Sequence, residues 1–271
     1  MWALPRTVLL VLLYLTFPHL CLCTVPNNLT GILPSELGQL EGLTHIKLEN
    51  QKGLIGPIPS TVGNLENLNS ISILFGGPDF GGTIPSSLFT IPSLEWISLL
   101  FNEGTWEFPP SVESTGNSLL GITMTSTGLS GTVPSFISEF TSLTQLGFTG
   151  NNLEGTIPDS FGSLTQLEYL NMYNNNLNGS LPQTFVKLTN LTAISIGKNN
   201  FQGSLPSWLG NLDKLRLLDL SYNNFEGSIP STFSQLSSLE HVSLQHNCNL
   251  NGSISAFEPL QRLSSLLLYE N

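Results

Sequence analysis

Charged side chains are scarce in this chain of 271 residues, because Asp, Glu, Lys and Arg together make up 10% of it. An ordinary soluble domain contains about 25%. Positive charge is particularly rare, since 8 lysines and arginines stand against 19 acidic residues and leave a net charge of −11. Nucleic acids and anionic membrane surfaces both require a basic patch, so this composition argues against them as partners. The polar surface must be made mainly of Asn, Ser, Thr, Gln and Gly.

Cysteine is also rare, and two of the three cysteines lie within residues 1–23. This segment has the form of a secretory signal peptide, in which Arg6 precedes an apolar run at residues 8–17 that is too short to span a bilayer comfortably. An uncleaved signal anchor is the alternative. Cleavage before Thr24 would leave Cys248 alone, so no internal disulfide could form. We expect Cys248 to be a small, half-buried core residue, with pairing between molecules as the alternative.

The chain consists largely of one row of residues that is repeated many times. Ten rows begin at regularly spaced leucines, 25 or 26 residues apart at first and then 24: Leu43, Leu68, Leu94, Leu119, Leu143, Leu167, Leu191, Leu215, Leu239 and Leu263. Each row follows the frame LxxLxLxxN, and most continue as LxGxIPxxL. A fixed period of this length is typical of a solenoid, in which each repeat buries its apolar face against its neighbours.

The frame assigns a physical role to each of its positions. Alternating leucines direct apolar side chains to one face of a short strand, and stacked rows place parallel strands about 4.8 Å apart. The row-ending asparagines can pair the backbone where it turns off the strand: Asn102, Asn151, Asn175, Asn199, Asn223, Asn247 and Asn271. The following Gly permits a positive φ, and Pro ends the ladder. Apolar pairs three residues apart, such as Phe161 and Leu164, suit a short 3-10 turn.

These rows resemble the plant-type leucine-rich repeat over residues 27–271. The resemblance implies an α/β solenoid: a right-handed leucine-rich-repeat superhelix with a parallel β-sheet on the concave face and 3-10 turns on the convex face. Residues 24–271 would then form one solenoid of about ten 24-residue repeats. Members of that family serve mostly as ectodomains of receptor-like kinases or receptor-like proteins, or as secreted polygalacturonase inhibitors.

The chain departs from the family pattern in several places. It has no paired-cysteine caps, and its rows are irregular at residues 76–81 and 102–117. Gln51, Gly76 and Thr127 replace the row-ending asparagine. The mature chain would begin and end within a repeat, which predicts a fragment of a longer protein or an end covered by a partner.

No catalytic constellation stands out in the sequence. His241, Ser243 and Asp219 fall on strand positions, and a flat strand supplies neither the strained nucleophile turn nor the oxyanion hole that a Ser/His/Asp triad needs. His241, His246 and Cys248 are closely spaced potential metal ligands. We interpret them instead as exposed polar side chains beside a lone thiol. The glycines follow the repeat and form no phosphate-binding loop. We therefore expect no enzyme activity, no cofactor and no bound metal.

The best candidate for a functional surface is the concave strand face, formed by the residues between the leucines. Two aromatic patches occur there, and aromatic residues dominate the energetics of interfaces. One consists of Phe75, Trp96 and Phe101, with Leu74 and Leu100 beside them, for which packing over an irregular loop is an equal alternative. The other consists of Tyr169, Tyr173, Tyr222 and His246. The predicted ligand-binding set adds Asn171, Lys198 and Asp219 beside them.

Four Asn-x-Ser/Thr sequons lie beyond the predicted signal peptide, at Asn28, Asn178, Asn190 and Asn251. Such sequons match a secreted protein. Asn, Ser and Thr are abundant in the repeat, so chance is the alternative origin. We expect two or three of the four to carry glycan.

Composition, repeat and resemblance together predict a non-catalytic binding module, secreted or on the extracellular face of the plasma membrane. Its partner would be a protein, a peptide or a cell-wall glycan, with the membrane involved only through a tether outside this chain. A secreted inhibitor of a cell-wall-degrading enzyme is the alternative, although the concave face carries few charges. Ice binding is a weaker alternative; it rests on an interrupted column of hydroxyls: Ser72, Ser98, Thr123, Ser195 and Ser243.

Overall fold

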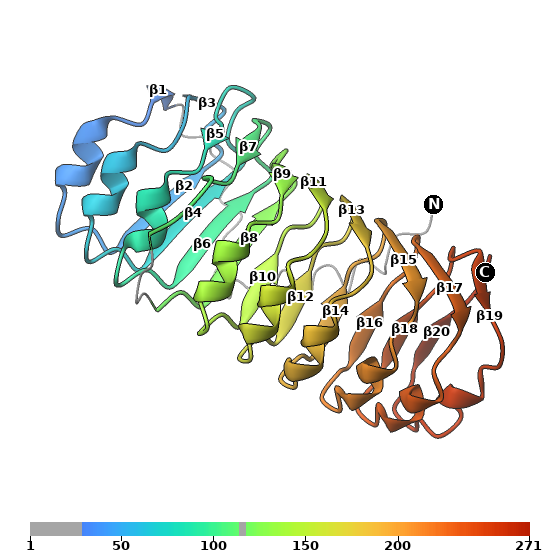
Figure 1. The fold of residues 1–271 in the computed structure, drawn as a ribbon. Coiled ribbons are helices and arrows are strands. Elements are labelled where there is room, and N and C mark those ends of the chain that lie inside the picture. Colours follow the sequence, from blue (N-terminus) through green and yellow to red (C-terminus); the bar gives the residue numbers. More distant parts are fainter. Residues whose placement is uncertain (1–28, 114–117) are drawn as a thin grey trace.

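The computed structural model describes residues 29–113 and 118–271. The predicted signal peptide, the sequon at Asn28 and residues 114–117 of the second irregular segment lie outside the described residues. In the described part, every row forms one turn of a curved coil, and the rows stack along a single axis (Figure 1). None of the helices there has the length and apolar character needed to cross a bilayer.

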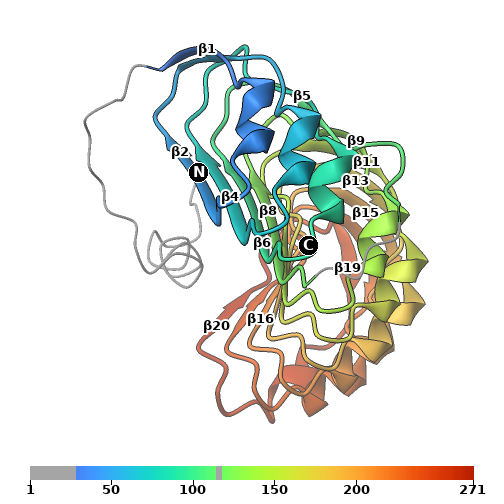
Figure 2. The same ribbon diagram turned by 90° about the vertical axis from the view of Figure 1, so that its left-hand side faces the viewer.

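A ten-stranded parallel sheet contains one strand from each row and lines the inner side of the curve (Figure 2). Its strands follow one another in chain order: β2 (His45–Glu49), β4 (Ser70–Leu74), β6 (Trp96–Leu100), β8 (Gly121–Thr125), β10 (Gln145–Gly147), β12 (Tyr169–Asn171), β14 (Ala193–Ser195), β16 (Leu217–Asp219), β18 (His241–Ser243) and β20 (Ser265–Leu267). Leu146 pairs with Leu170, Leu170 with Ile194, and Ile194 with Leu218. The predicted leucine spine is therefore confirmed.

A second set of strands runs along the side of the coil. An eight-stranded parallel sheet, here called the lateral sheet, contains β5 (Gly82–Thr83), β7 (Trp106–Glu107), β9 (Ser130–Thr132), β11 (Asn152–Gly155), β13 (Asn176–Gly179), β15 (Asn200–Ser204), β17 (Asn224–Ser228) and β19 (Asn249–Asn251). At the N-terminal end, β1 (Thr30–Ile32) pairs with β3 (Gly53–Ile55) as a separate two-stranded sheet. The strand pattern LxL predicted only the first sheet, so the lateral sheet is an addition.

Short 3-10 helices cover the outer side of the curve (Figures 1 and 2), as predicted. They are η1 (Ser35–Gln39), η2 (Ser60–Asn64), η3 (Ser86–Thr90), η4 (Ser135–Glu139), η5 (Asp159–Ser163), η6 (Gln183–Lys187), η7 (Ser207–Asn211), η8 (Ser231–Gln235) and η9 (Ser255–Phe257). The first eight begin directly after a proline, for example Pro158 before η5, whose φ is −62°. Proline fixes that torsion and donates no hydrogen bond, so it ends the strand and starts the turn.

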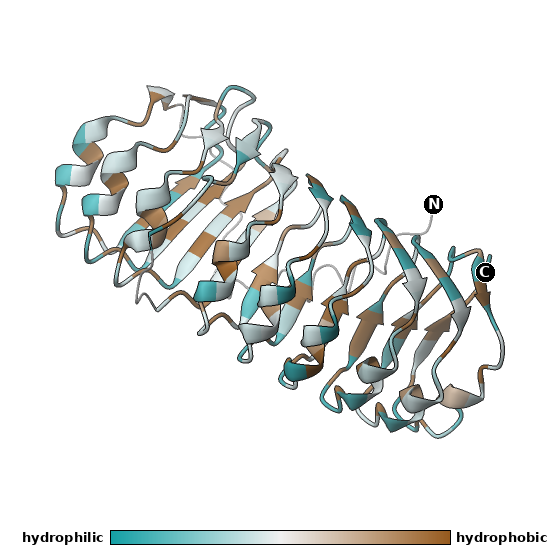
Figure 3. Ribbon diagram, viewed as in Figure 1, coloured by the Kyte–Doolittle hydropathy of each residue, from teal (hydrophilic) through white to brown (hydrophobic). Residues whose placement is uncertain are grey.

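The core is one continuous column of apolar side chains between the strands and the 3-10 helices. Figure 3 colours the hydrophobic residues along these elements brown. The strand residue Leu170 and the helix residue Phe185 are both almost fully buried, as are their equivalents in neighbouring rows. Each such leucine contributes about 1.5–3 kcal/mol by leaving water. Because every row adds the same contacts, stability grows with the number of rows.

The row-ending asparagines form a buried ladder. Asn199 is typical: its Oδ1 accepts from the Leu177 N–H at 3.0 Å, and its Nδ2 donates to the carbonyls of Met172 at 2.9 Å and Ile196 at 3.0 Å. Asn175, Asn223 and Asn247 repeat this pattern. The prediction that these amides satisfy the turning backbone is confirmed, and each one joins two rows.

Three early rows solve the same problem without the asparagine. Gln51 reaches both Leu29 N and the Glu49 carbonyl. Gly76 has no side chain, and its N–H donates to Oδ1 of Asn102 in the following row at 2.7 Å. Thr127 donates its N–H and its hydroxyl to Oδ1 of Asn151.

Cys248 lies in the loop that enters β19 and is exposed. The expectation that it is a half-buried core residue is therefore wrong. Row nine has one extra residue at this point, so the thiol is directed away from the leucine column.

Candidate functional site

The residue just before the ladder position has a positive φ in row after row, and its side chain stands at the end of a concave strand. These residues are Asn50, Phe75, Phe101, Ser126, Gly150, Asn174, Lys198, Tyr222, His246 and Glu270, with φ between 51° and 70°. Asn and Gly adopt this backbone readily, whereas bulky side chains do so rarely. Together they form a column, here called the rim column, which crosses the rows. Several members were predicted as binding residues from the sequence but the column was not, although their shared place in the repeat frame contains that information.

Four predicted residues meet near the C-terminal end of the concave face. The rings of Tyr222 and His246 are stacked, with centroids 4.0 Å apart. The Lys198 ammonium lies 5.6 Å from the Tyr173 ring centroid and 5.9 Å from that of Tyr222. Such cation–π contacts contribute about 0.5–1 kcal/mol at exposed sites. We call Tyr173, Lys198, Tyr222 and His246 the tyrosine cluster.

Two residues that were not predicted extend the tyrosine cluster. Nδ1 of His246 lies 2.8 Å from Oε2 of Glu270, and the Tyr269 ring meets the imidazole edge-on at a centroid distance of 5.5 Å. Tyr222 is 38% exposed and Tyr269 is 48% exposed, so a partner could reach both rings. Both unpredicted residues follow from the repeat frame, one row beyond His246.

Asp219 lies beneath this surface rather than on it, since only 3% of the residue is exposed. Its Oδ1 accepts from the Ser221 hydroxyl at 2.6 Å and from the Ser221 N–H at 3.1 Å. Burial raises the pKa of the Asp219 carboxyl, and the hydrogen bonds from Ser221 and Ser195 offset only part of that effect. Burial, together with the negative charge of Asp219, raises the pKa of Tyr173 to about 12. Tyr173 therefore remains a neutral hydrogen-bond donor at physiological pH.

Asn171 and Tyr169 have other surroundings. Oδ1 of Asn171 accepts from the Tyr173 N–H at 3.1 Å and so supports the turn that presents Tyr173. Tyr169 begins β12, four residues and roughly 13 Å along the strand from Tyr173. The single patch predicted from Tyr169, Tyr173, Tyr222 and His246 is therefore wrong for Tyr169, which stands at the opposite end of the strands.

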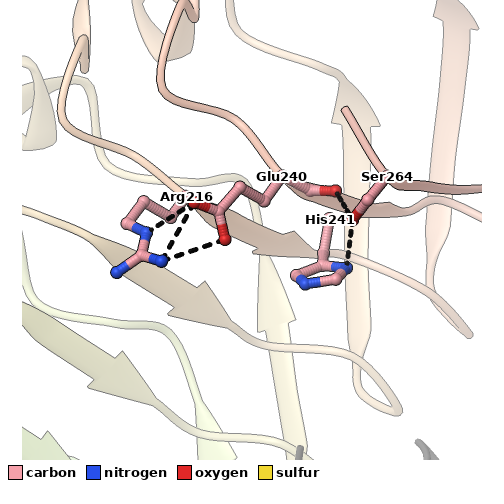
Figure 4. A network of polar contacts seen from close by, with 4 residues as sticks. All are labelled: Arg216, Glu240, His241 and Ser264. Atoms are coloured by element: carbon pink, nitrogen blue, oxygen red, sulfur yellow. Dashed lines mark hydrogen bonds and ion pairs between the residues drawn. The ribbon is translucent and has the colours of Figure 1, made fainter. Parts of the chain in front are cut away.

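An ion pair closes the face at the end where Tyr169 stands. Nε and Nη2 of Arg216 each donate to the Glu240 carboxylate at 3.0 Å, and the hydrogen bond from Arg216 lowers the pKa of Glu240. Figure 4 shows the Glu240 side chain facing Arg216, while its main-chain carbonyl accepts from the Ser264 hydroxyl at 3.0 Å. The Ser264 hydroxyl also lies 3.5 Å from Nδ1 of His241. This network joins rows eight, nine and ten.

The predicted N-terminal patch is also divided. Phe75 and Phe101 belong to the rim column, with their rings stacked at a centroid distance of 5.5 Å and Phe75 39% exposed. Trp96 stands at the other end of β6 and covers Gly121, where a Cβ would overlap its ring. Leu100 is buried. The expectation of one patch is wrong, because the strand length separates Trp96 from the two phenylalanines.

The described residues contain no group of three His, Cys, Asp or Glu side chains arranged to hold a metal ion. His241 begins β18, whereas His246 belongs to the rim column beyond its end. The two histidines therefore stand apart on the face.

The three described sequons all lie off the ten-stranded sheet. Asn178 in β13 and Asn251 in β19 are exposed on the lateral sheet. Asn190 lies at the other margin, where its Nδ2 donates to the Thr165 carbonyl at 2.9 Å and its Oδ1 accepts from Lys214 at 2.8 Å. None of the three would place a glycan on the tyrosine cluster.

Comparison with known proteins agrees with this architecture. The family model described as a leucine rich repeat matches residues 141–201 and 189–250. No match was found among the curated proteins.

Among solved structures, a TDR receptor is 32% identical, with a TM-score of 0.77, and the match covers 89% of this chain and 41% of the receptor. The plant peptide hormone receptor RGFR1, solved in complex with RGF2, is 26% identical with a TM-score of 0.63, covering 90% of this chain and 46% of that one. The Arabidopsis receptor kinase HAESA, in complex with the peptide hormone IDA and the co-receptor SERK1, shares the fold at 24% identity and a TM-score of 0.70, over 90% and 45% of the two chains. The chain thus spans less than half the length of these receptors. In its rows, its asparagine ladder and these matches, the chain is similar to leucine-rich-repeat proteins and to plant receptors.

Proposed function

We propose that this chain is a non-catalytic, extracellular binding module that holds a protein or peptide ligand on its concave face, and that the tyrosine cluster provides the main contact. The observation that carries the proposal is the joining of Tyr173, Lys198, Tyr222 and His246 across four consecutive rows. The ring of Tyr222 and that of the adjoining Tyr269 are exposed. Exposed aromatic side chains on a rigid surface are the usual anchors of an interface.

The chemistry of the tyrosine cluster favours a polypeptide partner. Its rings offer apolar area, its phenols offer hydrogen bonds, and within the described residues no carboxylate lies within 4.0 Å of the Lys198 ammonium. Lys198 is therefore free to pair with an acidic group of a ligand. A related receptor, RGFR1, was solved in complex with RGF2. The three described sequons avoid the concave sheet, so they fit an extracellular setting and leave this face uncovered.

The two alternative functions receive less support from the same face. A charged inhibitor surface would need free charges, yet Lys47 is paired with Glu49 at 2.8 Å and Asp219 is buried. Ice binding would need exposed hydroxyls in one column. Ser98, Ser195 and Ser243 do align across their rows, but all three are buried.

The experiment is a binding selection followed by substitution. A displayed library of random 12-residue peptides is selected on the wild-type chain, and the enriched peptides are used as probes. We expect Tyr173→Ala with Tyr222→Ala to weaken their binding by about 100-fold or more, the loss of two anchors of about 1–2 kcal/mol each. Asn152→Ala on the lateral sheet is the matched control and should bind as the wild type does. If the double variant binds as the wild type does and its far-ultraviolet spectrum is unaltered, the tyrosine cluster is not the main contact.

A further inference from the structure

A broad groove lies on the side of the coil, away from the tyrosine cluster. Its volume is about 1170 Å³, and it runs over β13, β15 and β17 beside the starts of η5 and η6. Its neutral polar lining consists of Thr156, Ser180, Gln183, Gln202, Asn224 and Asn249. Asp159 and Glu226 add negative charge, and none of the lining residues is basic. The groove therefore suits a neutral, hydroxyl-rich occupant and repels an anionic one.

A sequon opens directly onto this groove. Asn178 is exposed in β13, and the next two residues of its sequon, Gly179 and Ser180, line the groove. The residues that occupy the place of Asn178 one and two rows further along, Gln202 and Glu226, also line it. A group attached to Asn178 is thus within immediate reach of the groove.

We propose that Asn178 carries an N-linked glycan and that the inner sugars of this glycan lie in the lateral groove. In the attachment step, Nδ2 of Asn178 bonds to the anomeric carbon of a lipid-linked oligosaccharide pyrophosphate. The bond from that carbon to the pyrophosphate breaks, and Nδ2 loses one proton. Sugar hydroxyls then both donate to and accept from the side-chain amides of Gln202 and Asn224. Gly203, which has no side chain, leaves room for a sugar ring to approach the strand.

The other described sequons lack this setting. Asn251 is exposed on β19, but the next two residues of its sequon, Gly252 and Ser253, do not line the groove as Gly179 and Ser180 do. Asn190 lies at the opposite margin and holds a hydrogen bond to the Thr165 carbonyl. The glycan on Asn178 covers part of the lateral sheet and leaves the concave face as the open surface. This inference does not depend on the proposed ligand, so each can fail without the other.

The test uses the full chain secreted from a mammalian host. Glycopeptide mass spectrometry first reads the occupancy of Asn178, and we expect the glycan to be present. Peptide-N-glycosidase is then applied to the native protein, and release from Asn178 is followed over time. Gln202→Ala with Asn224→Ala should speed release about tenfold, equivalent to about 1.4 kcal/mol of lost contact. Asn152→Ala, which changes an exposed amide of β11 outside the groove, should leave the rate unchanged.

Two results would overturn the proposal. An unmodified Asn178 in the secreted protein would contradict the proposed glycan attachment. If Gln202→Ala with Asn224→Ala does not alter the release rate, the glycan lies in solvent rather than in the groove. A comparison of melting temperatures separates the glycan from the protein: Ser180→Ala, which abolishes the sequon, should lower Tm by about 2 °C in the secreted protein. The same change should have no effect in protein made in bacteria, which carries no glycan.

Discussion

The first four rows and the last six build the same coil in different ways. Concave strands of the early rows have five residues, as in β4, whereas those of the later rows have three, as in β16. Three of the first four rows place Gln51, Gly76 or Thr127 at the ladder position, and the later rows place Asn there without exception. The two halves therefore keep the same fold with different hydrogen bonds. The early rows use substitutes for the asparagine at single positions, and the later rows use a continuous ladder of asparagine amides.

This difference separates the residues that stabilise the coil from the residues that stand on its surface. In the later rows, one amide side chain joins two rows, so the backbone is already satisfied and the rim column can carry Lys198, Tyr222 and His246. In the early rows, the neighbouring row supplies the missing bonds, and aromatic rings fill irregular space, as Phe80 does against Trp106. In the later rows, a regular backbone therefore occurs together with varied side chains in the rim column.

Removal of one ladder amide should show the largest effect. Asn199→Ala leaves the buried Leu177 N–H without a partner, and it removes one of the two amide donors to the carbonyls of Met172 and Ile196. The unpaired N–H costs about 1–3 kcal/mol and each lost bond about 0.5–1.5 kcal/mol, so we expect a loss of about 3 kcal/mol in the free energy of unfolding. Gln51→Ala removes only two bonds near the N-terminal end and should cost about 1 kcal/mol. Urea denaturation measures both. Equal losses would mean that the ladder is no more important than its substitutes.

A pair of glycine substitutions tests the packing of the two halves. A Cβ at Gly121 would overlap the Trp96 ring, whereas one at Gly147 would meet Cγ2 of Thr123 at an ordinary 3.5 Å. Gly121→Ala should therefore cost about 1–3 kcal/mol and shift the tryptophan emission, because the ring must move. Gly147→Ala should be nearly neutral. Thermal unfolding and fluorescence measure the difference, and a harmless Gly121→Ala would contradict the close packing of Trp96.

The sequence predicted the parts of the fold that repeat. The period placed the leucine spine, the 3-10 helices and the asparagine ladder correctly, because each follows from one side chain at one position in every row. It did not predict the lateral sheet. The residues of β13, Asn-Leu-Asn-Gly, have little strand propensity, and they pair only because the stacked rows bring their backbones together.

The candidate site was harder to predict, because it depends on how deeply each side chain is buried and on how far along its strand the residue lies. Asp219 and Tyr169 occupy outward positions in the frame, yet the first is buried under its neighbours and the second lies at the far end of its strand. Alternation assigns a side chain to a face but does not show what covers it. The rim column, in contrast, depends only on the place before the ladder, and the sequence contains that information.

Among the described residues, the early rows have no buried carboxyl like that of Asp219, and there Lys47 and Glu49 pair at the surface. Because burial raises the pKa of Asp219 in the folded state, its contribution to stability is fully present below the unfolded value of about 3.9 and is lost as the pH rises through the raised value. Asp219→Asn should therefore be more stable than the wild type at neutral pH, by about 1 kcal/mol, and equal to it in acid. Urea midpoints at several pH values measure this. A pH-independent difference for Asp219→Asn would contradict the raised pKa.

The smallest effect should appear in the ionisation of Tyr173, which reports the charge beneath the tyrosine cluster. The carboxylate of Asp219 is one cause of its pKa of about 12, after burial. Asp219→Asn removes that charge and keeps the ring in place, so the pKa of Tyr173 should fall while remaining above the ordinary value for tyrosine. Ultraviolet absorbance of the phenolate follows the titration, and the difference between each protein and its Tyr173→Phe version isolates this one ring. Identical titrations in the two proteins would mean that Asp219 and Tyr173 are too far apart to interact, and that the later rows hold their buried charge independently of the surface above it.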